Sequence, residues 1–368
     1  MTSTQNVSSQ PIAQPVSVVT LTDGNQLPQD ALDLLSAAEQ VSMQCGHPWY
    51  SILVQEVFPT PGQVQWMVLR EAGRCTAVWP LLTGSLAGAL SNYYTALYQP
   101  AHAAFVTPTG LKELAKALRT QRAGRGKLVF GPMDPETPEF MAMETALRAS
   151  GYRTYRFFRF GNWYLPCAGV HWEQYFSDRK GAVRSTVRRM AKKLSADGGT
   201  LEIIFGGPRL QAGIDAYEHA YSSSWKQTEP YPGFIRALIT TAAERGWLRL
   251  GVAWLDGQAI AAQLWIVAHG RAEIFKVAYN EAFKAYTAGT LLTAMLMEHV
   301  LDQDKVKEVD YLIGDDAYKK TWMSDRRERW GLVAYDPWSL VGFNGIVRSV
   351  GGRLLKRFRP KQPIVEKS

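Results

Sequence analysis

Three consecutive strand-like runs in the second half of the chain constrain the fold more than any other feature. They are Leu248–Leu255, Gln258–Val267 and Ala272–Tyr279. Asp256 is the single Asp, Glu, Lys or Arg between positions 250 and 269, so this stretch is also long and apolar enough to suggest a membrane-spanning helix. However, Asp256-Gly257 is a hairpin signal in its middle, and β-branched and aromatic residues flank the pair. The stretch therefore predicts an antiparallel hairpin, and we expect no transmembrane segment.

A similar order of elements is predicted in the two halves of the chain. The first half shows two strands joined by a short turn, then a helix and a strand, at Gln63–Arg70, Cys75–Leu82, Leu111–Arg119 and Lys127–Gly131. In the second half, the strand-like runs are followed by a helix at Thr290–Gln303 and a strand at Glu308–Leu312. The two halves share element order but no matching sequence. The order predicts the α+β class, with mixed, mostly antiparallel sheets flanked by helices.

Length and composition set the domain plan. A chain of 368 residues suggests two domains at about 150 residues each. The first residues are rich in Ser, Thr and Gln and lack the basic and apolar regions of a secretory signal. We expect a disordered leader at 1–20, a first domain at 21–165, a second domain at 166–345 and a basic tail at 346–368.

Cysteine and histidine usage argues against disulfide and metal chemistry. Cys45, Cys75 and Cys167 are too few and too scattered for a disulfide framework or a structural zinc site. The six histidines form no closely spaced pair. We therefore expect no metal and a reducing, cytoplasmic location. The sequence also lacks a Walker loop, a dinucleotide-binding glycine motif and a nucleophile elbow, which counts against nucleotide hydrolysis, redox and hydrolase chemistry.

Positive charge is concentrated in two segments. The whole chain carries a net charge of +8, while residues 178–193 and residues 346–368 each carry +6. In the first segment, Val183, Val187 and Leu194 form an apolar helical stripe with arginines and lysines opposite. Either segment is a solvated face or a surface for an acidic partner. The second also has an amphipathic pattern suited to an anionic membrane surface.

Several short segments of the two halves occur in an order that resembles one superfamily. They are His47–Tyr50, Ala77–Leu81, Trp172–Phe176, Arg184–Leu194, Ser224–Lys226, Phe275–Asn280, Tyr286–Leu292, Asp310–Asp315 and Tyr318–Trp322. Together they resemble the acyl-CoA N-acyltransferase (GNAT) superfamily over residues 30–335. Within it, the order is most similar to bacterial cellulose- or exopolysaccharide-biosynthesis acetyltransferases, which are related to Fem-type aminoacyl transferases. The resemblance implies two GNAT-like domains in tandem. One departure is that Lys284–Gly289 keeps a single glycine of the superfamily's pyrophosphate loop.

The resemblance implies a site in the second domain that uses acetyl-CoA or another acyl-CoA as co-substrate. A helix N-terminus suits a pyrophosphate, so the donor is expected at Gly289, Thr290 and Leu291, with Lys276, Val277 and Tyr279 on the preceding strand. Lys276 and Tyr279 lie three residues apart and would face opposite sides of a regular strand. The remaining candidates are Tyr318, Lys319, Asp315 and Asp310 as catalytic residues, and Trp225, Lys226, Arg184 and Arg188 as substrate-binding residues. Tyr318 would be the leaving-group acid, and an aspartate the base.

Three functions are compatible with these residues. The first is N- or O-acyl transfer, with acetyl as the expected group, to a sugar, a lipid-linked sugar or another precursor of an envelope or extracellular polysaccharide. The second is Fem-like aminoacyl transfer from tRNA, in which the basic helix would follow an RNA backbone. The third is a non-catalytic GNAT-like scaffold in polysaccharide synthesis. No DNA partner is expected, tRNA is expected only under the second function, and the basic tail would bring the protein to the inner face of the membrane.

Overall fold

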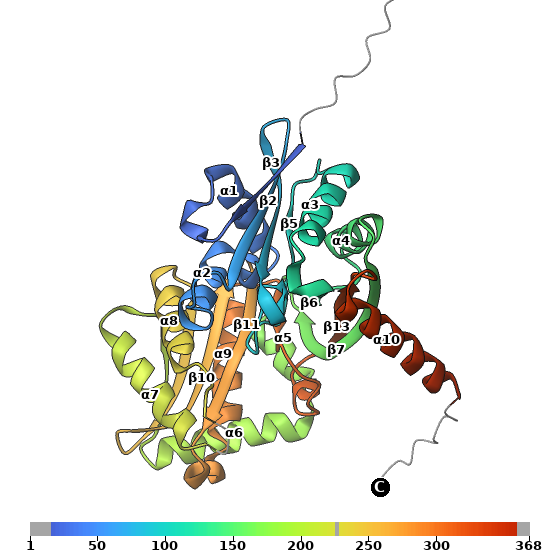
Figure 1. The fold of residues 1–368 in the computed structure, drawn as a ribbon. Helices are drawn as coiled ribbons and strands as arrows, with labels where there is room; N and C mark the ends of the chain where they lie inside the picture. Colours follow the sequence, from blue (N-terminus) through green and yellow to red (C-terminus); the bar gives the residue numbers. More distant parts are fainter. Residues whose placement is uncertain (1–15, 225–227, 359–368) are drawn as a thin grey trace, which may run out of the picture.

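The computed structural model describes residues 16–224 and 228–358. Across these residues the strands pair into one mixed sheet, in the order β1-β2-β3-β4-β6-β13-β7-β12-β11-β10-β9-β8, with β5 beside β3 (Figure 1). Their bounds are β1 Val16–Leu21, β2 Val64–Glu71, β3 Arg74–Leu82, β4 Gly88–Ala89, β5 Ala101–His102, β6 Lys127–Met133, β7 Arg153–Pro166, β8 Thr200–Ile204, β9 Leu248–Leu255, β10 Gln258–Ala268, β11 Arg271–Tyr279, β12 Glu308–Asp310 and β13 Asp325–Tyr335.

The sheet is built from two similar halves that meet at β13 and β7. Each half has three successive antiparallel strands, β1-β2-β3 and β8-β9-β10. A further strand then pairs in parallel with the strand that follows a helix, as β4 does with β6 and β11 with β12. β7 pairs with β13 along most of its length and with β12 at its end. The α+β class and the repeated order predicted from the sequence are confirmed. The boundary expected at 165/166 falls at the end of a strand that serves both halves.

Helices cover both faces of this sheet. The described helices are α1 Gln29–Glu39, α2 His47–Glu56, α3 Pro108–Thr120, α4 Pro138–Ala149, α5 Trp172–Ser177, α6 Gly181–Ala196, α7 Leu210–Ser222, α8 Pro232–Glu244, α9 Ala288–Asp302 and α10 Leu340–Phe358. In the second half, Ala261 packs with the α6 and α9 side chains, whereas its neighbour Ala262 belongs to the core on the α7 face. Alternate strand residues point to opposite faces, so α7 and α9 enclose β10 between them.

The two halves are joined by a shared core and by buried polar contacts. Trp49 of α2 packs edge-on against Phe234 of α8, with ring centroids 5.2 Å apart, and against Phe275 of β11 at 6.0 Å. Buried Glu273 of β11 accepts hydrogen bonds from Ser42 at 2.8 Å and from the Gln44 side chain at 3.3 Å. Because these contacts cross from one half to the other, the first half fixes the position of β11.

At both ends of the described chain, an ordered element crosses the boundary predicted from the sequence. Val16–Leu21 form β1, so the end of the expected leader is a strand paired with β2; residues 1–15 lie outside the described part. The expected tail begins inside α10, which extends away from the sheet (Figure 1). Among the described helices, none is both long and apolar enough to cross a bilayer.

Candidate active site

A cavity opens where β11 and β12 stop pairing. The parallel register ends at Glu273 and Asp310, and a cavity of about 720 Å³ lies beyond this point. The backbone N–H of Tyr311 donates to the carbonyl of Trp163 on β7 at 2.9 Å, which draws the chain away from β11. The walls come from four segments: Asn92–Thr95, Phe157–Phe160, Ile274–Val277 and the turn from Tyr311 to Lys319.

A bulge in β11 aligns its residues with this cavity. The register with β10 shifts so that Leu264 pairs with Lys276 while Trp265 pairs with Ile274, which leaves Phe275 as the extra residue. A bulge interrupts the strict alternation of side chains along a strand. The result is that four consecutive residues, Ile274–Val277, all reach the cavity wall.

Lys276 is held at the wall by a buried carboxylate and tyrosines. Its Nζ lies 2.8 Å from Glu229 Oε1, and the Tyr94 hydroxyl donates to Glu229 Oε2 at 2.6 Å. Nζ also lies over the Tyr93 and Tyr94 rings, 5.1 and 4.8 Å from their centroids. Burial lowers the pKa of Lys276 from its ordinary value, and Glu229 opposes that shift. The ion pair with Glu229 offsets the cost of burying a lysine in a central strand.

The start of α9 has features that suit an anionic ligand. The first N–H groups of a helix have no partner within it, and no side chain caps this one. The hydroxyl of Thr287, the residue before α9, is buried and has no hydrogen-bond partner in the described chain. A methyl group placed on Gly289 would meet Val277 Cγ1 at 4.0 Å, so the space before the helix is open toward the cavity wall. These residues fit the phosphates of an acyl-CoA.

The cavity lining does not include three of the predicted donor-binding residues, Tyr279, Thr290 and Leu291. Leu291 is buried in the core between α6 and α9, and its backbone N–H donates to the Thr287 carbonyl at 3.3 Å, so neither its side chain nor its N–H is open to a ligand. Thr290 is half-buried in the first turn of α9, and its N–H bonds to the Thr287 carbonyl at 2.9 Å. Tyr279 packs against the same core at the end of β11 and does not line the cavity.

Tyr318 and Lys319 both line the cavity, but Tyr318 is half exposed and Lys319 is buried. Tyr318 is half exposed and stands edge-on to the Tyr311 ring at 5.6 Å. Burial, with Asp316 nearby, raises the pKa of Tyr318 to about 12. Lys319 is buried, and its Nζ donates to the carbonyls of Tyr311 at 3.3 Å and Ile313 at 2.5 Å. Lys319 therefore fixes the turn that carries the cavity wall.

The two aspartates lie outside the cavity lining. Asp310 is buried, pairs with Arg327 and Arg271, and accepts from Asn162 at 2.5 Å and from the Leu312 N–H at 2.7 Å. Burial acts to raise its pKa, but the arginines outweigh that effect and hold the pKa below its ordinary value. Asp315 is a surface residue, and its hydrogen-bonded pair with Arg326 lowers its pKa. Their catalytic role stays a prediction without a supporting contact.

The basic helix α6 contacts the loop before α9 through its C-terminal end. Lys193 Nζ lies 4.6 Å from the Tyr286 ring centroid, and the Tyr286 hydroxyl donates to Asp197 at 2.8 Å. Arg188 is exposed, and Arg184 is half-buried with an Nε that has no partner in the described chain. Trp225 and Lys226 lie outside the described residues.

Two cavity segments and the carboxylate partner of Lys276 were not identified from the sequence. Glu229, Asn92–Thr95 and Phe157–Phe160 come from distant parts of the chain, and no spacing links them to β11. The signals available were the adjacent tyrosines at 93 and 94 and the aromatic run on β7, neither of which is specific.

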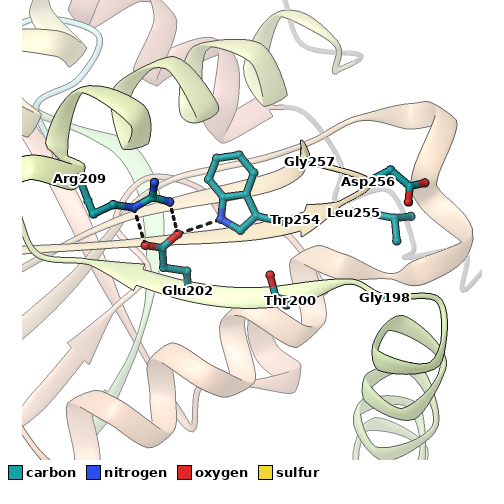
Figure 2. Close-up of a pocket in the computed structure, with 8 residues that line it drawn as sticks. All are labelled: Gly198, Thr200, Glu202, Arg209, Trp254, Leu255, Asp256 and Gly257. Carbon is teal, nitrogen blue, oxygen red and sulfur yellow. Dashed lines mark hydrogen bonds and ion pairs between the residues drawn. The ribbon is translucent and has the colours of Figure 1, made fainter.

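A second pocket lies at the outer edge of the second half, over β8 and the β9–β10 turn. Figure 2 shows Glu202 held there by Arg209 and by the indole N–H of Trp254. Its volume is about 360 Å³, and the Arg209 and Trp254 side chains donate to Glu202 within it. It contains none of the predicted site residues. The described chain also holds no group of three or more His, Cys, Asp and Glu side chains placed to bind a metal ion.

Comparison with known proteins identifies a family domain in the second half of the chain. Residues 181–320 match the model of the acetyltransferase (GNAT) domain. This stretch includes β11, the start of α9, Tyr318 and Lys319, which are the elements of the cavity in the second half. The match places a GNAT-type acyltransferase domain in the second half of the chain. No curated protein matches this chain.

Solved structures share the fold at low sequence identity. FemX is 11% identical, with 90% of this chain and 99% of that chain covered and a TM-score of 0.59. The C-terminal domain of a protein described as a lysylphosphatidylglycerol synthetase, from Agrobacterium fabrum, is 15% identical, with 89% and 97% covered and a TM-score of 0.52. A tandem GNAT protein from the clavulanic acid biosynthesis pathway is 14% identical, with 86% and 98% covered and a TM-score of 0.50. The expected tandem GNAT fold is confirmed.

Proposed function

We propose that the protein transfers an acyl group, with acetyl as the first candidate, from acyl-CoA to a sugar or lipid-linked sugar precursor of an envelope or extracellular polysaccharide. The observation that carries the proposal is the cavity between the ends of β11 and β12, with the uncapped start of α9 beside it. An acyl-CoA supplies a thioester, whose carbonyl carbon accepts a nucleophile and whose thiolate leaves.

The donor would lie along β11. The pairing of β11 with β12 ends at Glu273, and an extended donor would lie along β11 beyond this point. The start of α9, with Thr287 and Gly289, would hold the phosphates. Lys193 at the end of α6 adds a positive charge beside this loop.

The acceptor side of the cavity favours a ring with both apolar and polar faces. Tyr93, Phe158 and Tyr318 line it and remain 64%, 49% and 52% exposed, although large aromatic side chains are usually buried. A sugar ring can lie on such an aromatic face, while its hydroxyls bond to nearby polar groups. Lys276 has three N–H donors, and Glu229 takes one.

The proton balance assigns a role to Tyr318. In the transfer, the bond from acceptor nitrogen or oxygen to the acyl carbon forms, the carbon–sulfur bond breaks, and one proton moves from acceptor to thiolate. Because its pKa is about 12, the Tyr318 hydroxyl keeps its proton at neutral pH. It would donate that proton to the thiolate as the proton lost by the acceptor replaces it, so that no tyrosinate is left behind. The lysine and tyrosines from both halves would orient the acceptor.

Calorimetric titration with acetyl-CoA tests the donor. We expect micromolar binding by the wild type and at least tenfold weaker binding by Gly289→Tyr, whose ring would fill the space before α9. Gly181→Tyr is the matched control, because an added Cβ on Gly181 meets nothing within 4 Å and this residue lies at the far end of α6. Equal binding by all three proteins would place the donor elsewhere. No binding would remove acetyl-CoA and direct the test to longer acyl-CoAs and to charged tRNA.

Aminoacyl transfer from tRNA is the second candidate, and α6 favours it. No ion pair is recorded for Arg184, Arg188, Arg189, Lys192 or Lys193 within the described chain. Such a row of cations without carboxylate partners suits an RNA backbone, and binding to it would weaken steeply with salt. Filter binding of charged tRNA at two salt concentrations separates this candidate from an acyl-CoA enzyme. If neither donor binds, the scaffold role remains the explanation to test.

We also propose that α10 brings the enzyme to an anionic membrane surface at the cytoplasmic face. Trp338, just before α10, and Leu340, Phe343 and Val347 on it are each more than half exposed. Exposed apolar side chains on a basic segment favour interfacial binding. We expect cosedimentation with vesicles that contain anionic phosphatidylglycerol and little with neutral phosphatidylcholine vesicles. Equal recovery with both would contradict the proposal.

A further inference from the structure

The first half contains the counterpart of the cavity, and the chain itself fills it. β4 and β6 pair in parallel through Gly88 and Val129, as β11 and β12 do in the second half. After β4, residues 94–100 are all buried. Tyr98 bonds to β6 and to β3, the neighbour of β4: its N–H donates to the Pro132 carbonyl at 2.6 Å, and its hydroxyl donates to the Pro80 carbonyl at 3.1 Å.

The helix of the first half is also occupied. α3 stands between β4 and β6 in the chain, as α9 stands between β11 and β12. At its start, Thr107 caps the helix by accepting from the Gly110 N–H at 3.0 Å. The buried Glu71 carboxylate accepts from the Thr107 N–H at 3.3 Å and from the Thr107 hydroxyl. A methyl group on Gly110 would come within 2.6 Å of Glu71 Oε1. An internal anion therefore sits where an anionic ligand would bind.

The segment that closes the first gap contributes a wall to the second. Ser91 bonds to the Gly131 carbonyl at 2.8 Å, which anchors one side of the loop beside β6. The next residues, Asn92–Thr95, line the cavity of the second half, where Tyr94 reaches Glu229 and Tyr93 faces Lys276. The same short segment thus blocks one site and completes the other.

We propose that the chain binds one acyl donor, in the second half alone, and that the first half is a closed copy whose Asn92–Thr95 loop forms the acceptor side of that single site. The proposal rests on the acyl-CoA donor proposed above. It assigns Tyr93 and Tyr94 to the acceptor wall, and it assigns Glu71 and Tyr98 to filling the first half.

Native mass spectrometry of the full chain with excess acetyl-CoA tests the stoichiometry. We expect one acetyl-CoA per chain for the wild type and for Gly181→Tyr, and none for Gly289→Tyr at the same concentrations. Two per chain, or one retained by Gly289→Tyr, would overturn the inference while leaving acetyl-CoA as the donor. No acetyl-CoA on any protein would overturn the donor proposal and this inference with it.

A variant of the first half gives an independent measurement. Glu71→Gln keeps the shape of the side chain and removes its charge, so we expect a lower melting temperature and an unchanged Kd for acetyl-CoA by calorimetry. A change of tenfold or more in acetyl-CoA affinity in Glu71→Gln, in either direction and with the melting temperature unchanged, would place the donor in the first half and contradict the proposal.

Discussion

Two lysines line the cavity of the second half. Half-buried Lys276 and buried Lys319 both line it, yet their partners differ. Lys276 pairs with a carboxylate and tyrosine rings, whereas Lys319 donates to backbone carbonyls of the turn after β12. The first is therefore placed to meet an acceptor, and the second holds the wall that carries Tyr318.

Replacing Tyr318 tests the proton-donor role. We expect Tyr318→Phe to keep its acetyl-CoA affinity and to lose about 10²- to 10³-fold in kcat, because the ring remains while the hydroxyl is lost. Steady-state release of free thiol from acetyl-CoA, with the acceptor present, measures kcat. Tyr335→Phe, on β13 outside the cavity lining, is the control. A Tyr318→Phe enzyme with wild-type kcat would exclude this tyrosine as the acid.

Glu273 predicts a pH dependence of stability. Burial raises the pKa of Glu273 to about 7, above its ordinary value of 4.5. Between these two values the folded state binds more protons than the unfolded state, so stability falls as pH rises, by about 3 kcal/mol in total. Glu273→Gln should remove this slope, because its neutral amide stays uncharged. Urea unfolding at pH 5 and pH 8 measures it; the same pH slope in both proteins would contradict the assignment.

At the scale of elements, α6 and the loop before α9 form the proposed phosphate-binding corner. The contact is made by the C-terminal end of α6, where Lys193 covers Tyr286. Arg184 and Arg188, predicted from the sequence as substrate-binding residues, lie on the same helix nearer its N-terminal end. Helix periodicity identifies the basic face of α6, but it does not show which end meets α9.

Neutralising one lysine of α6 tests this corner. We expect Lys193→Gln to raise the Kd for acetyl-CoA about threefold to tenfold and to reduce its dependence on salt, since one exposed charge contributes on the order of 1 kcal/mol. The matched control is Lys192→Gln, an exposed neighbour with no contact to Tyr286. Equal effects of the two substitutions in calorimetric titrations would mean that α6 acts only through its overall charge.

At the scale of the whole molecule, one sheet and a shared core join the two halves. β7 and β13 pair with each other and with strands of both halves, and Trp49 packs across the junction. Such continuity predicts that the halves unfold together, because neither can lose its central strands without exposing the core of the other.

Calorimetric unfolding tests the coupling of the halves. We expect one transition for the wild type and, for Trp49→Ala, one transition at a lower temperature, with a loss of about 3–5 kcal/mol typical of a buried aromatic side chain. The substitution should also weaken acetyl-CoA binding, since Trp49 supports Phe275 on β11. Two separate transitions in the wild type would show that the halves are independent.

The sequence predicts local elements well and the site in part. The β9–β10–β11 meander and α3 follow from alternation, turn residues and helical periodicity, which are properties of neighbouring residues. The two-residue strands β4 and β5 and the full length of β7 depend on pairing with distant strands, so no local pattern reveals them. Glu229 joins the site for the same reason, through a contact with Lys276 that spacing does not encode.

The most direct test of the account is a crystal structure of the protein with acetyl-CoA bound. The account predicts density for one molecule per chain, with the phosphates at the start of α9, the pantetheine chain along β11 and the thioester within reach of the Tyr318 hydroxyl. Density between β4 and β6, or in the pocket over β8 and β9, would contradict it.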